Sequence, residues 1–121
     1  MITEKNGTFC LETENTSYLF EIMETGHPEH LYYGRKIHFR DTAALREKHP
    51  FAGGNTNYYD AAHKNLGLED VCLEMSAYGK GDIREPFLEV VHADGSFTSD
   101  FLYDSFEITE MKQEQETEFL L

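Results

Sequence analysis

Short runs of alternating apolar and polar residues, separated by turn-forming residues, constrain the fold of this sequence most strongly. The run "TFCLET" is followed by the turn-forming "ENTS", and "YLFEIMET" then places Tyr18, Phe20 and Ile22 on one face of a period-two pattern. "GHPEH" predicts a second turn and "HLYYG" a third strand, which "KIHF" can extend beyond Gly34. Side chains of a strand alternate between its two faces, so these runs indicate β-strands joined by short turns. Residues 8–39 therefore predict an antiparallel meander.

Strand-like patterns return in the second half of the chain. Four runs carry them, at residues 69–75, 87–93, 96–103 and 105–108. A chain of 121 residues is long enough for one hydrophobic core and short for two. We therefore predict a single all-β domain over residues 1–121, an antiparallel β-sandwich of two sheets with six to nine strands.

The stretch "EPFLEVVHADGSFTSDFLY" predicts a β-hairpin within this second half. Pro86 is tolerated at the start of a strand, where the hydrogen-bond ladder has not begun. Asp94 and Gly95 predict a type I′ turn, in which both central residues have positive φ. The residues expected to face the core are Phe87, Val91 and either Phe101 or Tyr103.

The segment between the two β-rich parts, residues 41–66, lacks a strand pattern. Asp41 or Thr42 can cap a short helix that runs to His49, and Pro50 would end it. A connection of this length is long for a compact domain, in which most connections take roughly 4–6 residues. We therefore expect the loop to be functional or to order against another surface.

The charge balance excludes two classes of partner. The chain has 23 acidic against 10 basic residues and a net charge of −13. Nucleic acids and anionic membrane surfaces are bound by basic faces, so neither is an expected partner. No apolar run approaches the roughly 20 residues of a membrane span. The acidic residues are scattered, which is typical of a solvated surface.

The cysteines and the N-terminal residues bear on the cellular compartment. Cys10 and Cys72 both lie in apolar patterns and belong to no C-x-x-C pair, which favours two buried free thiols and leaves a disulfide as the alternative. The opening "MITEKNGTFC" has no signal-peptide pattern. We expect a cytoplasmic protein. The apolar end at residues 119–121 also suggests that the chain continues in a longer protein.

No cofactor or metal site is expected from the sequence. His27 and His30 are three residues apart, but Pro28 argues against a helix that would bring them to one face, and no third ligand is suggested. We assign them to a turn and a strand edge. The stretch "YGKGDIRE" lacks the glycine spacing of a phosphate-binding loop.

Three motifs in order give the chain a family resemblance. "YGKGDIREP" (residues 78–86) is followed by "ADGS" and "FLY", and "TSYLFEIMETGHPEHLYYGRKI" precedes them. This order and spacing resemble the N-terminal β-sandwich region of glycoside hydrolase family 36 α-galactosidases, from about residue 9 to 108. The sequence departs from the family pattern at residues 75–77, where a proline is usual, and at Ile83, where a phenylalanine is usual. The motif residues, to which we assign structural roles, are Tyr78, Gly79, Asp82, Arg84, Pro86, Asp94 and Gly95.

The resemblance implies a non-catalytic part of a larger enzyme. Family members resemble multidomain proteins in which a β-supersandwich precedes a (β/α)₈ barrel, and they hydrolyse terminal α-galactosides such as melibiose and raffinose with retention. Retention requires two carboxylates roughly 5–5.5 Å apart, which the family places in the barrel, one of them in a Lys-Trp-Asp motif. This chain has no tryptophan and is too short for a barrel of roughly 250 residues. Neither catalytic aspartate is therefore expected here.

The resemblance also implies partners and a role for the long loop. The expected partners are the catalytic barrel of the parent chain and other copies in a homo-oligomer, with galactosides as indirect ligands. In family members the corresponding loop reaches the active-site rim of a neighbouring subunit. The residues that could contact a sugar there are Arg40, Asp41, Arg46, Tyr58, Tyr59 and Asp60. The tyrosine pair packing against the sandwich is the alternative for the loop. A stand-alone carbohydrate-binding module or a protein-interaction module is the alternative for the chain.

Overall fold

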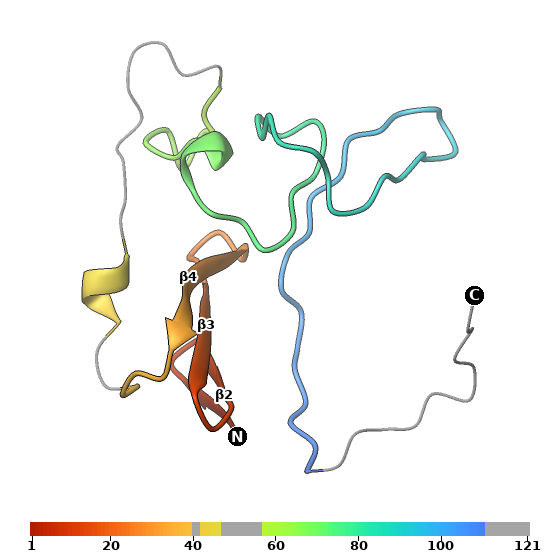
Figure 1. Ribbon diagram of the computed structural model, residues 1–121. Coiled ribbons are helices and arrows are strands. Elements are labelled where there is room, and N and C mark those ends of the chain that lie inside the picture. The colour runs from red at the N-terminus through yellow and green to blue at the C-terminus, as the bar shows by residue number, and fades with distance from the viewer. Residues whose placement is uncertain (40–41, 47–56, 111–121) are drawn as a thin grey trace, which may run out of the picture.

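A four-stranded antiparallel meander forms the N-terminal part of the protein (Figure 1). The computed structural model describes residues 1–39, 42–46 and 57–110. The strands β1 (Ile2–Lys5), β2 (Thr8–Glu12), β3 (Thr16–Ile22) and β4 (Pro28–Arg35) pair in the order of the sequence. This confirms the predicted meander and adds β1, which the sequence pattern did not predict.

The turns explain where the strands begin and end. Asn6 and Gly7 join β1 to β2, and both have positive φ, 53° and 78°. Between β2 and β3 the hydroxyls of Thr13 and Thr16 lie 2.7 Å apart, and Thr13 Oγ1 accepts the Thr16 N–H at 3.0 Å. After β4 the chain leaves the ladder, because the Ile37 N–H is donated to the Ser17 hydroxyl at 3.1 Å. The predicted extension by "KIHF" is therefore wrong.

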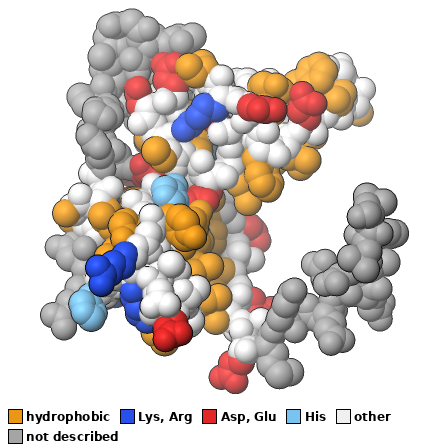
Figure 2. Space-filling model, viewed as in Figure 1, with side chains coloured by type: hydrophobic (Ala, Val, Ile, Leu, Met, Phe, Trp, Pro, Cys, Tyr) orange, Lys and Arg blue, Asp and Glu red, His pale blue; other side chains and the backbone are white. Residues whose placement is uncertain are grey.

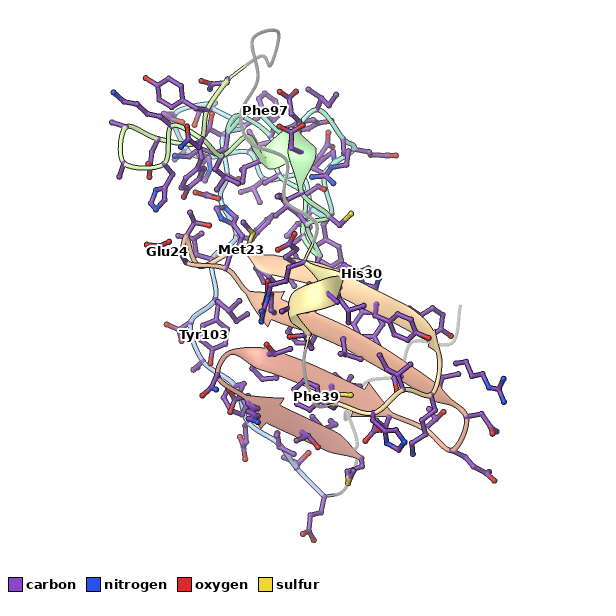
Figure 3. The ribbon with its side chains drawn as sticks, turned by 90° about the vertical axis from the view of Figure 1, so that its left-hand side faces the viewer. Met23, Glu24, His30, Phe39, Phe97 and Tyr103 are labelled. Atoms are coloured by element: carbon purple, nitrogen blue, oxygen red, sulfur yellow. The ribbon has the colours of Figure 1, made fainter. Side chains whose placement is uncertain are left out.

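The two faces of the sheet are covered by different segments. Tyr18 and Phe20 share one face as predicted, and on the other face Leu19 and Cys10, which pair across β2 and β3, are fully buried. The segment after β4 covers this buried face, and the segment that ends at residue 110 runs along the opposite face (Figures 1 and 3). There Phe9 stacks on Phe20 with ring centroids 4.8 Å apart.

The C-terminal segment meets the sheet through aromatic rings. The Phe106 ring meets Phe9 edge-on at 4.9 Å, and Tyr103 lies 6.4 Å from the same ring. The Tyr103 N–H is donated to the Gly26 carbonyl at 2.8 Å. Figure 3 shows Tyr103 beside the sheet, whereas Phe97 lies in the loop region above it.

Residues 57–110 contain little regular secondary structure. Their one β-bridge joins Leu73 to Glu29 of β4, and none of the four predicted runs forms a strand in the part of the chain that the structure describes. The fold is all-β with almost no helix, as predicted. Its one sheet has fewer strands than the predicted six to nine, and the second layer of a sandwich stays a prediction.

The predicted hairpin is wrong in two respects. Asp94 does not have positive φ, although Gly95 does, and the Gly95 N–H is donated to the His92 carbonyl at 2.9 Å. One left-handed residue after a tight turn replaces the type I′ turn. Phe87 is 66% exposed and Val91 is also exposed, so neither faces the core.

Two short 3₁₀ helices complete the described structure. They are η1 (Ala43–Leu45) and η2 (Leu68–Asp70). Thr42 precedes η1 but its side chain makes no capping hydrogen bond. The predicted helix from Asp41 or Thr42 to His49 is therefore a single turn where it is described, and its remainder lies outside the described residues.

Candidate functional site

Four of the six residues predicted to contact a sugar lie within the described structure, namely Arg46, Tyr58, Tyr59 and Asp60. Arg40 and Asp41 lie outside the described residues. Arg46 follows η1, and its Nε lies 2.5 Å from Oε2 of Glu21, a buried residue of β3. Tyr58 is 41% exposed. The ion pair with Glu21 holds Arg46 against the sheet.

Tyr59 belongs to a hydrogen-bonded chain that joins three segments. Its hydroxyl is donated to Oδ2 of Asp100 at 2.7 Å, and Oδ1 of Asp100 lies 2.7 Å from Nε2 of His27. Nδ1 of His27 lies 2.8 Å from the Thr25 hydroxyl. His27 is 2% exposed, and its ring meets the Tyr59 ring edge-on at 4.8 Å. The chain ties the β3–β4 turn, the long loop and the C-terminal segment together.

The surroundings of Tyr59 disfavour its ionised form. Burial, followed by the hydrogen bond and the negative charge of Asp100, raises the pKa of Tyr59 to about 12. The Lys80 ammonium lies 5.7 Å from the centroid of the Tyr59 ring. Tyr59 therefore acts in this structure as a neutral donor that holds the loop against Asp100 and His27.

Asp60 stabilises the loop that follows it. Its Oδ1 accepts the N–H groups of Ala62 and His63 at 2.9 and 2.8 Å, and it lies 2.8 Å from Nδ1 of His63. Burial raises the pKa of the Asp60 carboxyl, but the bonds to His63 and Ala62 together outweigh it and hold the pKa below its usual value. Asp60 thus caps a turn.

The motif residues Asp82 and Arg84 form a second anchor. Arg84 donates Nε–H to Oδ1 of Asp82 at 2.8 Å, and its two terminal nitrogens donate to the carbonyls of Val71 and Leu68 at 2.6 and 2.8 Å. Burial raises the pKa of the buried Asp82 carboxyl, but the hydrogen bonds and charge of Arg84 outweigh this and lower it. One guanidinium therefore fixes the segment around η2.

The other motif residues hold the neighbouring loops together. The Tyr78 carbonyl accepts the Ser99 N–H at 2.9 Å, and Oδ1 of Asp94 accepts the Ser96 N–H at 2.9 Å. Gly79 has a φ of 95°, and a Cβ there would lie 2.4 Å from the Thr98 hydroxyl oxygen. These contacts are structural, and they explain the spacing of the motif by loop geometry.

Sequence reasoning missed a polar cluster on the face of the sheet that carries Tyr18 and Phe20. The Tyr18 hydroxyl is donated to Oε2 of Glu74, and Oε1 of Glu74 lies 3.1 Å from Nδ1 of His30. Burial, then the hydrogen bond and charge of Glu74, raises the pKa of Tyr18 above its ordinary value. His30 was correctly placed at a strand edge, but no spacing in the sequence connects it to a residue 44 positions later.

The described residues contain neither a metal-binding cluster nor a membrane-spanning helix. No group of three or more histidine, cysteine, aspartate or glutamate residues there is arranged to hold a metal ion. In the same residues no helix is long and apolar enough to cross a bilayer. Cys10 is buried and Cys72 exposed, and both are free thiols, so the expectation of two buried thiols is wrong for Cys72.

Comparison with known proteins decides the family. The model of the glycosyl hydrolase family 36 N-terminal domain matches residues 26–118, which is most of the chain. The chain belongs to this family. The resemblance drawn from the motifs is thereby confirmed.

Similar proteins are α-galactosidases of much greater length. The bifunctional α-galactosidase/sucrose kinase AgaSK of Mediterraneibacter gnavus is 29% identical over 100 residues, which are 83% of this chain and 11% of that protein. The crystal structure of the α-galactosidase from Lactobacillus brevis superposes with a TM-score of 0.72 at 32% identity, over 81% of this chain and 13% of that one. A variant of the α-galactosidase AgaA from Geobacillus stearothermophilus, solved in complex with raffinose, superposes with a TM-score of 0.71 at 26% identity. The superposition covers 81% of this chain and 13% of that one. The chain thus spans about an eighth of the length of these relatives.

Proposed function

We propose that this chain is the non-catalytic N-terminal domain of a cytoplasmic, retaining α-galactosidase that hydrolyses terminal α-galactosides such as melibiose and raffinose. In this proposal the domain supports assembly of the enzyme and shapes the rim of the active site. Its partners are the catalytic barrel of the parent enzyme and further copies in a homo-oligomer. The two free thiols are consistent with a reducing compartment.

The exposed apolar surface of residues 83–108 is the observation that carries the proposal. Large apolar side chains stand out from this part of the chain, and Figure 2 shows hydrophobic side chains along it. The exposed members are Ile83, Phe87, Leu88, Val91, Phe97, Leu102, Phe106 and Ile108. Many large apolar side chains exposed along one segment are typical of an interaction site. The extended backbone beside it has hydrogen-bonding groups that a neighbouring strand could pair with.

The role at the active-site rim rests on the loop that contains Tyr58. Tyr58 is exposed, and Asp60 and Tyr59 fix the backbone on its C-terminal side through the contacts described above. An exposed aromatic ring on a fixed loop can stack on a pyranose face. Arg40, Asp41, Arg46 and Asp60 remain the proposed polar contacts of this rim.

A chimeric enzyme tests the proposal. The chain would replace the matching segment of the Geobacillus stearothermophilus α-galactosidase, and the release of galactose from melibiose and raffinose would be measured. We expect turnover by the chimera and none by the 121-residue chain. Tyr58→Ala in the chimera should raise KM more than it lowers kcat, and Tyr33→Ala, an exposed tyrosine of β4, is the matched control.

Two outcomes would contradict the proposal. Turnover by the pure 121-residue chain would show that it carries a catalytic centre of its own. A soluble but inactive chimera, beside an active parent enzyme, would show that the domain does not support this active site and would favour a stand-alone module.

A further inference from the structure

A cavity of about 790 Å³ opens at the end of the sheet where β3 turns toward β4. Four segments line it: the β1–β2 turn, residues 21–25, Arg46, and the loop at residues 62–66 together with Val71. Figure 3 shows Met23 and Glu24 at this end of the sheet, next to the loop region above it. The volume lies in the range of small-molecule sites, roughly 300–1,000 Å³.

The charges of the lining favour a neutral ligand. Glu21 and Glu24 contribute two carboxylates, and Arg46 and Lys64 contribute two cations. Their formal charges cancel, although the whole chain carries −13. An anionic ligand finds no excess of positive charge here and a cation no excess of negative charge. The lining therefore has no net formal charge, whereas the chain as a whole is strongly acidic.

The uncharged polar groups favour a ligand with many hydroxyls. Asn6 and Asn65 each carry a donor and an acceptor, and the Thr25 hydroxyl can do both. A sugar hydroxyl also donates and accepts, so alternating amides, carboxylates and cations can satisfy it. Apolar side chains complete the lining, among them Ile22 and Leu66. They can pack against the C–H face of a sugar ring.

The walls of the cavity are held in place by the fold. Glu21 is 8% exposed, lies in β3 opposite Thr8, and is bound by Arg46. Across the cavity, Asp60 fixes His63, and the Leu66 N–H is donated to the His63 carbonyl at 3.1 Å. A site whose groups are already ordered loses less conformational entropy when a ligand binds.

We propose that this cavity is a non-catalytic binding site for a neutral mono- or disaccharide. The proposal rests on the proposed function only in its choice of galactosides as the first probes. The site is formed by side chains of β3, of the turn that follows it and of residues 62–66. Of the residues proposed for the rim, Arg46 also lines this cavity.

Sugar titrations monitored by two-dimensional NMR test the site directly. The 121-residue chain, labelled with ¹⁵N, would be titrated with galactose, melibiose and raffinose. We expect saturable shifts in the amides of residues 21–25 and 62–66 and in the side-chain amides of Asn6 and Asn65. Galacturonate, the charged analogue of galactose, should bind more weakly, because the lining offers no excess positive charge.

Two variants assign the binding to the cavity. Asn65→Ala removes one exposed amide and should weaken binding about fivefold, which is the effect of one lost hydrogen bond. Asn15→Ala removes an equally exposed amide in the β2–β3 turn and should leave the affinity unchanged. Glu21→Gln keeps the shape of the side chain and should weaken binding by at least as much as Asn65→Ala. If Glu21→Gln fails to fold, the comparison of Asn65→Ala with Asn15→Ala still tests whether the sugar binds in the cavity.

The outcomes separate this proposal from the proposed function. The absence of shifts up to the solubility limit of each sugar, equal affinity of wild type and Asn65→Ala, or tighter binding of galacturonate would each overturn the cavity site. Shifts confined to residues 57–60 would also overturn it and would instead support the rim. Turnover by the chimera is not measured here, so an inactive chimera leaves this site standing.

Discussion

The sheet at residues 2–35 and the loop region at residues 57–110 are stabilised in different ways. The sheet has three consecutive antiparallel ladders, and its centre at Leu19 and Cys10 is fully buried. The loop region has one β-bridge to β4, and individual polar side chains hold it. Arg84 and Asp100 each join segments that lie far apart in the sequence. Backbone pairing thus stabilises one region and single anchors the other.

The two kinds of stabilisation predict different responses to mutation. A ladder distributes its stabilisation over many residues, so the loss of one surface side chain changes little. An anchor provides its stabilisation through one side chain, and the loss of that side chain leaves buried polar partners without a hydrogen bond. The loop region also exposes most of the large apolar side chains. We therefore expect the sheet to set the stability of the chain and the loop region to respond most to partners.

The largest expected effect is in the centre of the sheet. Leu19→Ala removes a fully buried side chain and should lower the free energy of unfolding by about 4 kcal/mol, through lost burial and the resulting cavity. Phe87→Ala, in the loop region, should change it by less than about 0.5 kcal/mol, because that ring is already exposed. Urea unfolding followed by far-ultraviolet circular dichroism measures both. Equal losses of unfolding free energy in the two variants would show that the sheet and the loop region do not differ in this way.

Removal of the Arg84 anchor should have the next largest effect. Arg84→Ala leaves the buried Asp82 carboxylate without its cation and should lower the free energy of unfolding by about 3 kcal/mol. Arg84→Lys keeps the charge, but a lysine cannot reach the three acceptors in the same geometry. Its free energy of unfolding should therefore lie between those of the wild type and Arg84→Ala. Hydrogen exchange should show the loss first around η2. A uniform loss across the sheet would contradict a local anchor.

A pair of glycines distinguishes crowding from backbone strain. Both Gly79 and Gly95 have positive φ, but a Cβ at Gly79 would collide with Thr98, whereas none of the structure lies within 4 Å of a Cβ at Gly95. Gly79→Ala should therefore lower the free energy of unfolding by about 2 kcal/mol and Gly95→Ala by about 1 kcal/mol. Thermal unfolding of the two variants would measure the difference. Identical values would show that the contact with Thr98 relaxes freely.

The smallest expected effect comes from the anchor at Asp100 and shows in its pH dependence. The pKa of Tyr59 is raised from 10 to about 12, so its contribution to stability is complete below about pH 10 and is lost as the pH rises through about 12. Asp100→Asn removes the charge and should bring this pKa part of the way back toward 10, since burial remains. We expect a loss of about 1 kcal/mol at neutral pH.

The titration of Tyr59, followed by ¹³C NMR of its ring, measures this shift. Asp104→Asn is the control, because Asp104 is exposed and bonds to the Ser105 hydroxyl. An unchanged Tyr59 titration in Asp100→Asn would show that Asp100 does not hold the tyrosine. A change of equal size in Asp104→Asn would show that the effect is one of overall charge.

The strands that were predicted correctly are those whose partners are adjacent in the sequence. β3 alternates regularly between buried and partly exposed residues, β2 and β4 are rich in apolar and aromatic residues, and a short turn joins each strand to the next. β1 was missed because Ile2 is its one large apolar residue and its pairing depends on the Asn6–Gly7 turn. The runs at residues 87–108 are also rich in apolar and aromatic residues, but within the described chain they have no strand to pair with. A strand requires a ladder, which local pattern cannot supply.

Local properties of the sequence, namely its apolar patterning, turn residues and motif order, were enough to predict the all-β class, the meander and the family. The tertiary structure decided that Tyr59 faces Asp100 and His27 and that Arg84 reaches the carbonyls of Leu68 and Val71. It also decided that residues 21–25 and 62–66 enclose a cavity. These contacts join residues that are 13 to 73 positions apart in the chain. Such contacts depend on how the loops cross the sheet, and no spacing along the sequence encodes that path.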